Sequence, residues 1–291
     1  MAYFLEQLIN GISQGAIYAL FAIGFALIVG VVGLPTFTHG EVIMIGAFGV
    51  YYCTSLVSGN LLLNILFCFV VTGLMGVLIH KICYERFENA PHYIPLVCTI
   101  GVSILVKNLA QIFFGSETKT MPPLIKPGFF ELGHIRISNV QLTVLGVVIA
   151  LSIVLTLFLY KTKYGRILRA VSQDKKAAAL VGINVQRATL LGNVIGCGIG
   201  GIGGMLYAIY YSTFSPTMGL GVAMKAFAST VLGGMTDISL SAIGGIAIGI
   251  LENLGIMLFS SSLRDLIAYL FLILVLLFLP YGLRLKGGRN R

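Results

Sequence analysis

The chain alternates long apolar runs with short polar stretches. Eight of these runs are long enough to cross the ~30 Å hydrocarbon core of a bilayer as helices. A ninth apolar run, 222–235, is shorter and is bounded by glycines. The pattern predicts an all-α, polytopic transmembrane helical bundle, and residues 1–291 are expected to form a single domain. The eight long runs are 8–34, 41–58, 60–80, 94–115, 139–160, 189–214, 240–260 and 265–283.

The basic residues predict how the bundle is oriented. Of 19 Lys and Arg, seven lie between Lys161 and Arg187 and four lie in the tail from Arg284 to Arg291. Cytoplasmic loops are enriched in such residues, so the 161–188 loop and the tail are both expected inside the cell. An even number of crossings must separate them, which predicts that 222–235 also crosses, as a short or broken helix. We therefore expect eight to nine crossings, with the N-terminus outside and the C-terminus cytoplasmic.

Composition narrows the classes of function. The sequence is 57% hydrophobic with 36 Gly, and its net charge of +9 comes from residues that flank apolar runs. These features favour a membrane protein and disfavour nucleic-acid binding. The five Cys form no C-x-x-C pair and the four His are scattered, so neither a metal site nor a catalytic site is predicted. No P-loop motif is present, so ATP phosphates are expected to bind elsewhere.

The run 189–214 contains two overlapping glycine patterns. Gly198, Gly200 and Gly203 spell G-x-G-x-x-G, but no acidic residue follows before Asp237, so the acid that holds a nucleotide ribose is missing. Glycines also recur at every fourth position, which places them on one face of a helix where another backbone can approach closely. We therefore predict a helix-packing stripe, made of Gly192, Gly196, Gly200 and Gly204.

The stretch "LPTFTHGEVIMIGAF" contains two ionisable residues between apolar runs. Pro35 is expected to end the first helix, and Thr38 with Glu41 fits the capping box that begins the next. His39 and Gly40 would then complete a tight turn. The alternative, a catalytic His–Glu pair, is disfavoured because the sequence shows no nucleophile–base arrangement.

The 161–188 loop is the longest polar interruption. Its run from Ala177 through Ala178 and Ala179 to Leu180 favours a short helix, which Gly182 can stop. A helix with such small side chains can sit in a groove of a partner protein. The alternative is an amphipathic helix that lies on the membrane surface with solvated lysines.

Ionisable side chains within the runs are few, and in a membrane bundle such residues can mark a functional site. Glu252 lies near the middle of its run, whereas Lys107 lies toward the outer end and can reach the interface. Both could instead be satisfied by packing within the bundle. If the bundle transports a solute, the polar residues predicted to line its path are Tyr18, Thr38, Asn108, Ser229 and Glu252.

Several blocks together resemble one family over nearly the whole chain. "GAIYALFAIGFALIVGV", "THGEVIMIGAF", "GRILRAVSQDKKAAALVGINV", "SPTMGLGVAMKAFASTVLGGM" and "GGIAIGILENLG" are similar to the LivH-type permease subunits of branched-chain amino acid ABC importers. The resemblance implies that the segment Ala177–Gly182, with Arg169 in the same block, receives force from ATP-binding subunits. Thr38 to Glu41 would shape the pore wall.

The resemblance also implies a function and partners. The chain would move branched-chain or related small amino acids into the cytoplasm by alternating access in the bacterial inner (plasma) membrane. It would bind no cofactor itself, because ATP and Mg would be held by two ATP-binding subunits. It would pair with a second related permease, in a hetero- or homodimer. An extracytoplasmic substrate-binding protein would deliver the substrate. Urea and amide uptake by the same class is one alternative. A stand-alone ion-coupled transporter or facilitator of small polar solutes is another.

Overall fold

The computed structural model describes residues 2–56, 59–87, 90–132, 135–258 and 264–278. Within these ranges every predicted apolar run contains a helix, because a backbone in hydrocarbon must satisfy its hydrogen bonds within the segment. The helices are α1 (Ala2–Val32), α2 (His39–Leu56), α3 (Leu61–Ile79), α4 (Tyr93–Phe114), α5 (Asn139–Lys161), α6 (Lys163–Gln173), α7 (Lys175–Leu180), α8 (Val185–Tyr211), α9 (Met218–Leu232), α10 (Ile238–Leu258) and α11 (Arg264–Phe278).

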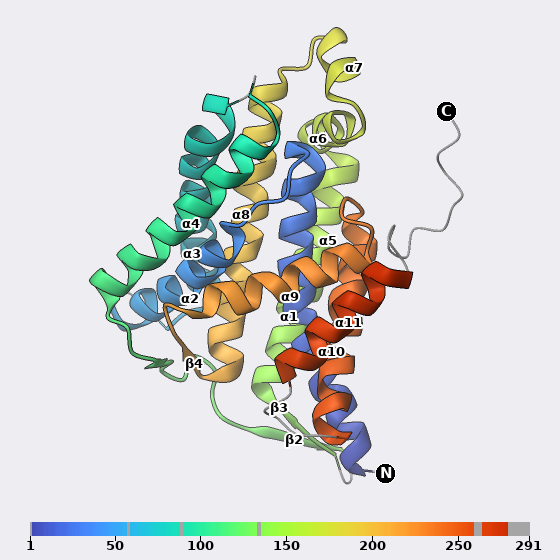
Figure 1. Cartoon of the computed structure of the whole chain (residues 1–291). Coiled ribbons are helices and arrows are strands. Elements are labelled where there is room, and N and C mark those ends of the chain that lie inside the picture. The colour runs from blue at the N-terminus through green and yellow to red at the C-terminus, as the bar shows by residue number, and fades with distance from the viewer. Residues whose placement is uncertain (1, 57–58, 88–89, 133–134, 259–263, 279–291) are drawn as a thin grey trace.

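Short elements complete the chain. A π-helical turn, η1 (His80–Tyr84), and a 3-10 turn, η2 (Glu85–Phe87), prolong α3. The strands β1 (Lys119–Thr120) and β4 (Thr213–Phe214) pair antiparallel, and so do β2 (Phe129–Leu132) and β3 (Ile135–Ser138). All four strands lie at the end of the molecule that holds the N-terminus, where they join helices without entering the bundle (Figure 1).

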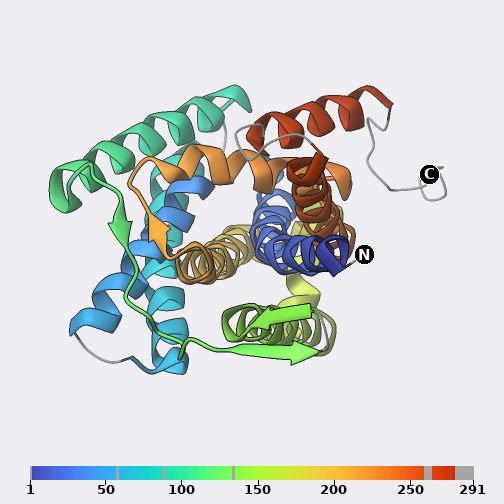
Figure 2. The ribbon, with the colours of Figure 1, turned by 90° about the horizontal axis from the view of Figure 1, so that it is seen from below.

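The predicted polytopic helical bundle is confirmed. Six described helices are long and apolar enough to cross a membrane: α1, α3 with its extension, α4, α5, α8 and α10. The most apolar stretch of α1 is entirely buried, whereas only 11% of that of α4 is buried. Figure 2 shows α1 and α8 nearly end-on in the middle of the molecule, with α4, α9 and α11 lying across them. The core is therefore built around α1 and α8.

The loop helices and the start of the chain lie at opposite ends of the molecule. The α6 and α7 helices form one end, and the start of α1 lies at the other (Figure 1).

The 15-residue α9 is the short helix expected between residues 222 and 235. It starts next to β4 and runs obliquely to a turn where Thr236 lies beside Gly30 and Arg169. The basic tail from Arg284 to Arg291 and the end of the run 265–283 lie outside the described residues.

Glycines allow the central helices to touch. The α1 and α10 backbones meet at Gly15 and Gly249, where a side chain on either residue would collide with the other helix. Contacts this close require glycine on at least one of the two helices.

The glycine stripe of α8 faces two helices. A Cβ at Gly196 would lie 2.7 Å from the carbonyl oxygen of Gly24 on α1. The other three members face Val31 on α1 and His39 and Ile43 on α2; they are Gly192, Gly200 and Gly204, respectively. The stripe thus turns toward α1 and α2 inside the bundle.

The prediction of a capping box at the start of α2 is wrong. His39 and Gly40 are helical rather than part of a turn, and the Thr38 hydroxyl pairs with that of Thr36 at 2.7 Å. One Glu41 carboxylate oxygen accepts a hydrogen bond from Ser103 on α4 at 3.1 Å, and the other has no hydrogen-bond partner in the described structure. The T-x-x-E spacing is local, but a hydroxyl 62 positions away engages the carboxylate.

Candidate functional site

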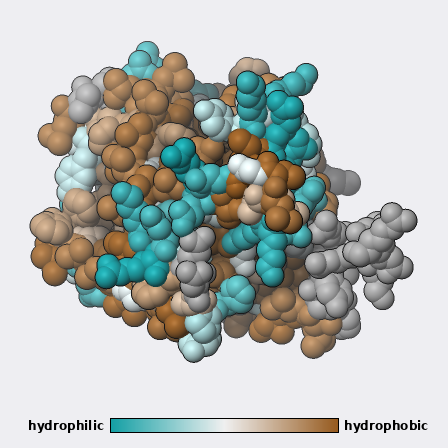
Figure 3. Space-filling view, turned by 90° about the horizontal axis from the view of Figure 1, so that it is seen from above, coloured by the Kyte–Doolittle hydropathy of each residue, from teal (hydrophilic) through white to brown (hydrophobic). Residues whose placement is uncertain are grey.

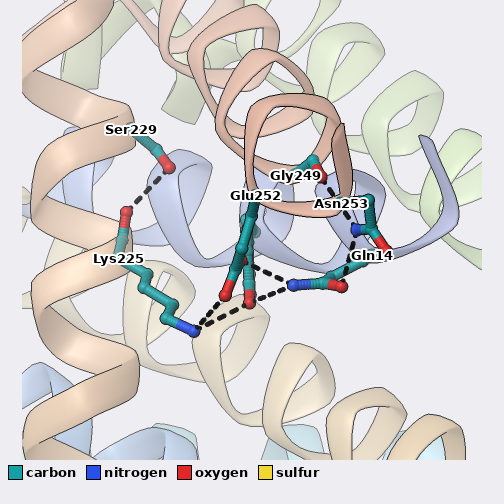
Figure 4. A network of polar contacts seen from close by, with 7 residues as sticks. Gln14, Lys225, Ser229, Gly249, Glu252 and Asn253 are labelled. Carbon is teal, nitrogen blue, oxygen red and sulfur yellow. Dashed lines mark hydrogen bonds and ion pairs between the residues drawn. The ribbon is translucent and has the colours of Figure 1, made fainter. Parts of the chain in front are cut away.

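Five polar side chains meet inside the bundle where α1, α9 and α10 come together, and we name them the buried polar cluster. They are Gln14 and Tyr18 on α1, Lys225 on α9, and Glu252 and Asn253 on α10. Each is at most 6% exposed. At the centre, the Lys225 Nζ and Glu252 Oε1 atoms are 2.7 Å apart (Figure 4). Oppositely charged groups this deep between apolar helices mark a candidate functional site.

Hydrogen bonds connect the ion pair to α1. The Gln14 amide nitrogen donates to Glu252 Oε2 at 2.6 Å and lies 2.6 Å from the Tyr18 hydroxyl. Lys225 Nζ also donates to the Tyr18 hydroxyl at 3.2 Å. The Asn253 amide donates to Gln14 Oε1 at 2.9 Å. Both charges are therefore held by neutral hydrogen-bonding groups as well as by each other.

Helix periodicity and glycine packing assemble this cluster. Gln14 and Tyr18 are four residues apart, so they lie on one face of α1. The close approach of Gly15 to Gly249 brings that face against α10. The Asn253 amide also donates to the Gly249 carbonyl at 2.9 Å, which fixes its direction along α10 (Figure 4). Bulkier residues at these glycines would move the polar side chains out of reach.

The charge arrangement limits what the cluster can do chemically. A buried ion pair costs desolvation energy that mutual attraction and hydrogen bonds offset only when the geometry is good. Here Lys225 and Glu252 neutralise each other, so the closed pair offers no net charge to a ligand. A charged solute or a proton could engage either partner only if the pair separated. The cluster can therefore lock α1, α9 and α10 together and release them when the pair opens.

A second polar spot lies at the start of α2. The His39 ring is 1% exposed, and its Nε2 lies 3.2 Å from the Phe21 carbonyl oxygen, while Nδ1 has no partner in the described structure. The ring packs edge-on against Phe25 with centroids 5.5 Å apart. Glu41 points toward α4 rather than toward His39, so these two residues form no catalytic pair.

The loop predicted to contact a partner forms α6 and α7 at the tip of the molecule. The Asp174 carboxylate accepts hydrogen bonds from two backbone amides of α7, and Gly182 ends the helix with φ +84°. Ala178 is buried against the chain itself, whereas Leu180 and Val181 are 88% and 77% exposed. The small side chain at Ala178 thus serves internal packing, and the exposed apolar side chains of the tip are Leu180 and Val181.

Two basic residues tie this tip to the bundle. Lys175 Nζ donates to the carbonyl oxygen of Val32, the last residue of α1. The Arg169 guanidinium lies 4.5 Å from the centre of the Tyr160 ring on α5. Seen from this end, hydrophilic residues gather across the middle of the face and hydrophobic residues surround them (Figure 3). This face of the molecule is thus largely polar around the exposed Leu180 and Val181, and α7 is attached directly to the central helix α1.

The structure brings together three of the five predicted path residues. Tyr18 and Glu252 belong to the buried polar cluster, and the Ser229 hydroxyl donates to the Lys225 carbonyl one turn earlier on α9. Thr38 is buried apart from them beside Thr36. Asn108 is exposed on α4, and its amide donates to the Ile104 carbonyl of its own helix.

Sequence reasoning missed Gln14 and Lys225. The signal for Lys225 was present, since it is a lone cation within the short apolar run 222–235, just as Glu252 is a lone anion in its run. Two such residues of opposite charge are expected to pair inside a membrane bundle. Gln14 carries no comparable signal.

Comparisons with known proteins match nearly the whole length of the chain. The family model described as the permease component of branched-chain amino acid transport systems matches residues 7–276. The chain belongs to this family. The LivH permease protein of Escherichia coli K12 is 34% identical over 97% of this chain and 95% of its own length. The BraD permease protein of Pseudomonas aeruginosa is 33% identical over the same shares.

A more distant relative extends the likeness. A probable LivH permease protein of Methanocaldococcus jannaschii is 26% identical over 91% of this chain and 87% of its own length. No solved structure matched this chain. Membership in the family makes this chain a transport component rather than an enzyme. The buried polar cluster and the α7 tip are therefore features of a permease.

Proposed function

We propose that this permease is the membrane subunit of an ATP-driven importer that carries branched-chain or related small amino acids into the cytoplasm. The observation that carries the proposal is the likeness to two high-affinity branched-chain amino acid permease proteins over 97% of the chain. The same likeness supports a location in the bacterial inner membrane. Because this chain has no P-loop motif, ATP and Mg would bind to partner subunits.

The proposed assembly uses both ends of the molecule. Two ATP-binding subunits would bind at the cytoplasmic α7 end, and an extracytoplasmic substrate-binding protein would bind at the end that holds the N-terminus and strands. This orientation agrees with the seven basic residues between Lys161 and Arg187. A second related permease, identical or different, would complete the path.

The α7 tip supplies the contact for coupling. Leu180 and Val181 project from the tip and would insert into a groove of the ATP-binding subunit, with the run Ala177–Ala179 and Gly182 shaping the short helix. Movement of α7 would reach α1 through the bond from Lys175 to Val32, and Arg169 would hold α6 in place. ATP binding would thereby bias the bundle between outward-open and inward-open states.

The buried polar cluster is the proposed internal end of this coupling. Opening of the Lys225–Glu252 pair would free α9 and α10 from α1 and would expose Tyr18 and Ser229 to the path. Thr38 would line the path at the start of α2, and Asn108, on the outward side of α4, would reach it only where the second permease completes the path. Alternating access then corresponds to alternate making and breaking of the ion pair.

Purification of the tagged chain from its native membrane in mild detergent tests the assignment. ATP-binding polypeptides are expected to co-purify, and ATP hydrolysis is expected to rise when a loaded substrate-binding protein is added. Reconstituted vesicles should then accumulate leucine, isoleucine or valine. Competition with urea and acetamide in the same vesicles would show whether the substrate is instead an amide. A chain that purifies without any ATPase, and is stable alone, contradicts the proposal.

One observation supports a second candidate, an ion-coupled transporter that works alone. Such carriers keep ionisable residues near the bilayer midplane, and this chain buries Lys225 and Glu252 between its helices. Uptake in whole cells separates the two functions. Loss of uptake with a proton ionophore, at maintained ATP, would favour ion coupling, whereas loss on ATP depletion at maintained membrane potential favours the importer.

A further inference from the structure

A long apolar groove lies between α2, α3 and α4, away from the buried polar cluster. Its volume is about 580 Å³. Aliphatic and phenylalanine side chains make up nearly all of the wall, and the Tyr52 ring and Gly49 complete it. The groove is partly open to the outside, and α4, which forms one of its walls, lies at the edge of the molecule (Figure 2).

The surroundings of the groove decide what can fill it. Both α3 and α4 are candidate membrane spans, and most of their surface faces outward. Water would find no hydrogen-bonding partners along such a wall, and an empty groove would lose packing contacts on every side. Hydrocarbon is the matching occupant, and in a bilayer the nearest source of hydrocarbon is a lipid acyl chain.

The length of the groove fits such a chain. Its lining residues on α3 and η1 extend from Phe67 to Ile82. At ~1.5 Å per helical residue, these positions span ~22 Å. One leaflet provides roughly 15 Å, half of the ~30 Å hydrocarbon core. The groove is therefore long enough to take an acyl chain of one leaflet over its full length.

Charge at one end of the groove identifies the head group. Lys81, next to Ile82, is exposed, and Arg86 follows five positions later, also exposed. Over residues 81–88 the sequence also carries Glu85 and Glu88, so the segment has no net positive charge, and the head-group assignment rests on the position of these two exposed cations at the end of the groove. This end of α3 lies at the same end of the molecule as α7 (Figure 1), which is the proposed cytoplasmic end. Exposed basic residues at the cytoplasmic end of a membrane span are attracted to anionic lipid head groups.

The opposite end of the groove is less suited to a phosphate. There Lys119 already lies 5.4 Å and 5.7 Å from the centres of the Tyr51 and Tyr52 rings. We propose that the groove binds an acyl chain of an anionic phospholipid whose phosphate lies beside Lys81 and Arg86.

A groove-filling variant tests for the acyl chain. A Cβ at Gly49 would meet only ordinary contacts, the nearest 3.5 Å away at Cys68 Sγ, so Gly49→Leu can extend into the groove without a backbone clash. Gly146→Leu on the open surface of α5 is the matched control, since nothing lies within 4 Å of its Cβ. The full chain is purified with its co-purifying subunits, delipidated with detergent, and its phospholipid is quantified by mass spectrometry.

The expected result is that wild type and Gly146→Leu retain the same anionic phospholipid, and that Gly49→Leu loses most of it. Lys81→Glu should keep the acyl chain in place but shift the retained lipid from anionic to zwitterionic species. Equal retention by wild type and Gly49→Leu would overturn the proposal. An unchanged lipid class in Lys81→Glu would overturn the assignment of the head group.

Photo-crosslinking separates a lipid from a protein occupant. Met75 lines the groove, and its replacement by benzoylphenylalanine places a reactive ketone against whatever fills it. An adduct with the mass of a phospholipid supports the proposal. An adduct with another polypeptide would show that the groove is an interface with a second permease and would overturn it.

Discussion

Removal of either charge from the Lys225–Glu252 pair is expected to destabilise the permease far more than removal of both. At a separation of 2.7 Å and an effective dielectric constant of about 20, the attraction between the two charges is about 6 kcal/mol. Desolvation offsets much of this, at several kcal/mol per ion. The net contribution of the pair to the free energy of unfolding is therefore small, but a single buried charge without its partner is strongly destabilising.

The test is a double-mutant cycle with Lys225→Met, Glu252→Gln and the double variant. Each single variant should lower the free energy of unfolding by about 3–5 kcal/mol, because it leaves an uncompensated buried charge. The double variant should lose less than about 2 kcal/mol, since Met and Gln are neutral and of similar size. Lys161→Met removes an exposed cation and should change stability by less than about 0.5 kcal/mol.

The assay is urea unfolding in mixed micelles, followed by the loss of helical circular dichroism, because the chain contains no Trp for fluorescence. The diagnostic quantity is the departure of the double variant from the sum of the two singles. If the single effects simply add, or if each single costs less than about 1 kcal/mol, the two charges are not a buried pair and the proposed lock between α1, α9 and α10 is wrong.

Three further predictions address the coupling end and the helix packing. Leu180→Glu should abolish co-purification of ATP-binding subunits without changing stability, whereas Leu180→Met should preserve it; retained binding by the Glu variant would remove α7 from the interface. Lys175→Met removes the hydrogen bond to the Val32 carbonyl, so it should leave ATP hydrolysis intact and lower the amount of substrate taken up per ATP. Lys176→Met, at an exposed position of α7, is the control. Equal uptake per ATP by the two variants would exclude the link from α7 to Val32. Gly204→Ala should cost about 1–3 kcal/mol in a thermal unfolding assay, because its Cβ would collide with the Ile43 carbonyl, whereas Gly221→Ala, which has open space, should not lower stability.

The helices could be predicted from the sequence because their signal is local. A backbone in hydrocarbon has almost no alternative to a helix, so the length of each apolar run determines its element. Gly182 ends α7 as expected, since its positive φ suits glycine. Glu252 and Tyr18 could be singled out as polar residues in apolar runs, but their partners could not, because Gln14 is 238 positions from Glu252.

The wrong capping-box prediction also arose because partners distant in sequence could not be foreseen. Thr38 and Glu41 have the required spacing, and in isolation each would satisfy backbone amides at the start of α2. In the fold, α4 offers Ser103 to the Glu41 carboxylate, and Thr36 offers its hydroxyl to Thr38. A motif read from spacing alone cannot include the competing partner that tertiary packing supplies.

The position of α1 explains how two distant sites could act together. Its end at Val32 accepts the hydrogen bond from Lys175 on α7, and Tyr18 lies in the buried polar cluster. The stretch of α1 from Tyr18 to Val32 spans ~21 Å at ~1.5 Å per residue. Nearly every residue of this stretch is buried, and a helix packed on all sides moves as one body because its neighbours resist bending. Displacement of α7 would therefore reach the Lys225–Glu252 pair as a shift of Tyr18 and Gln14, which hold that pair from the α1 side.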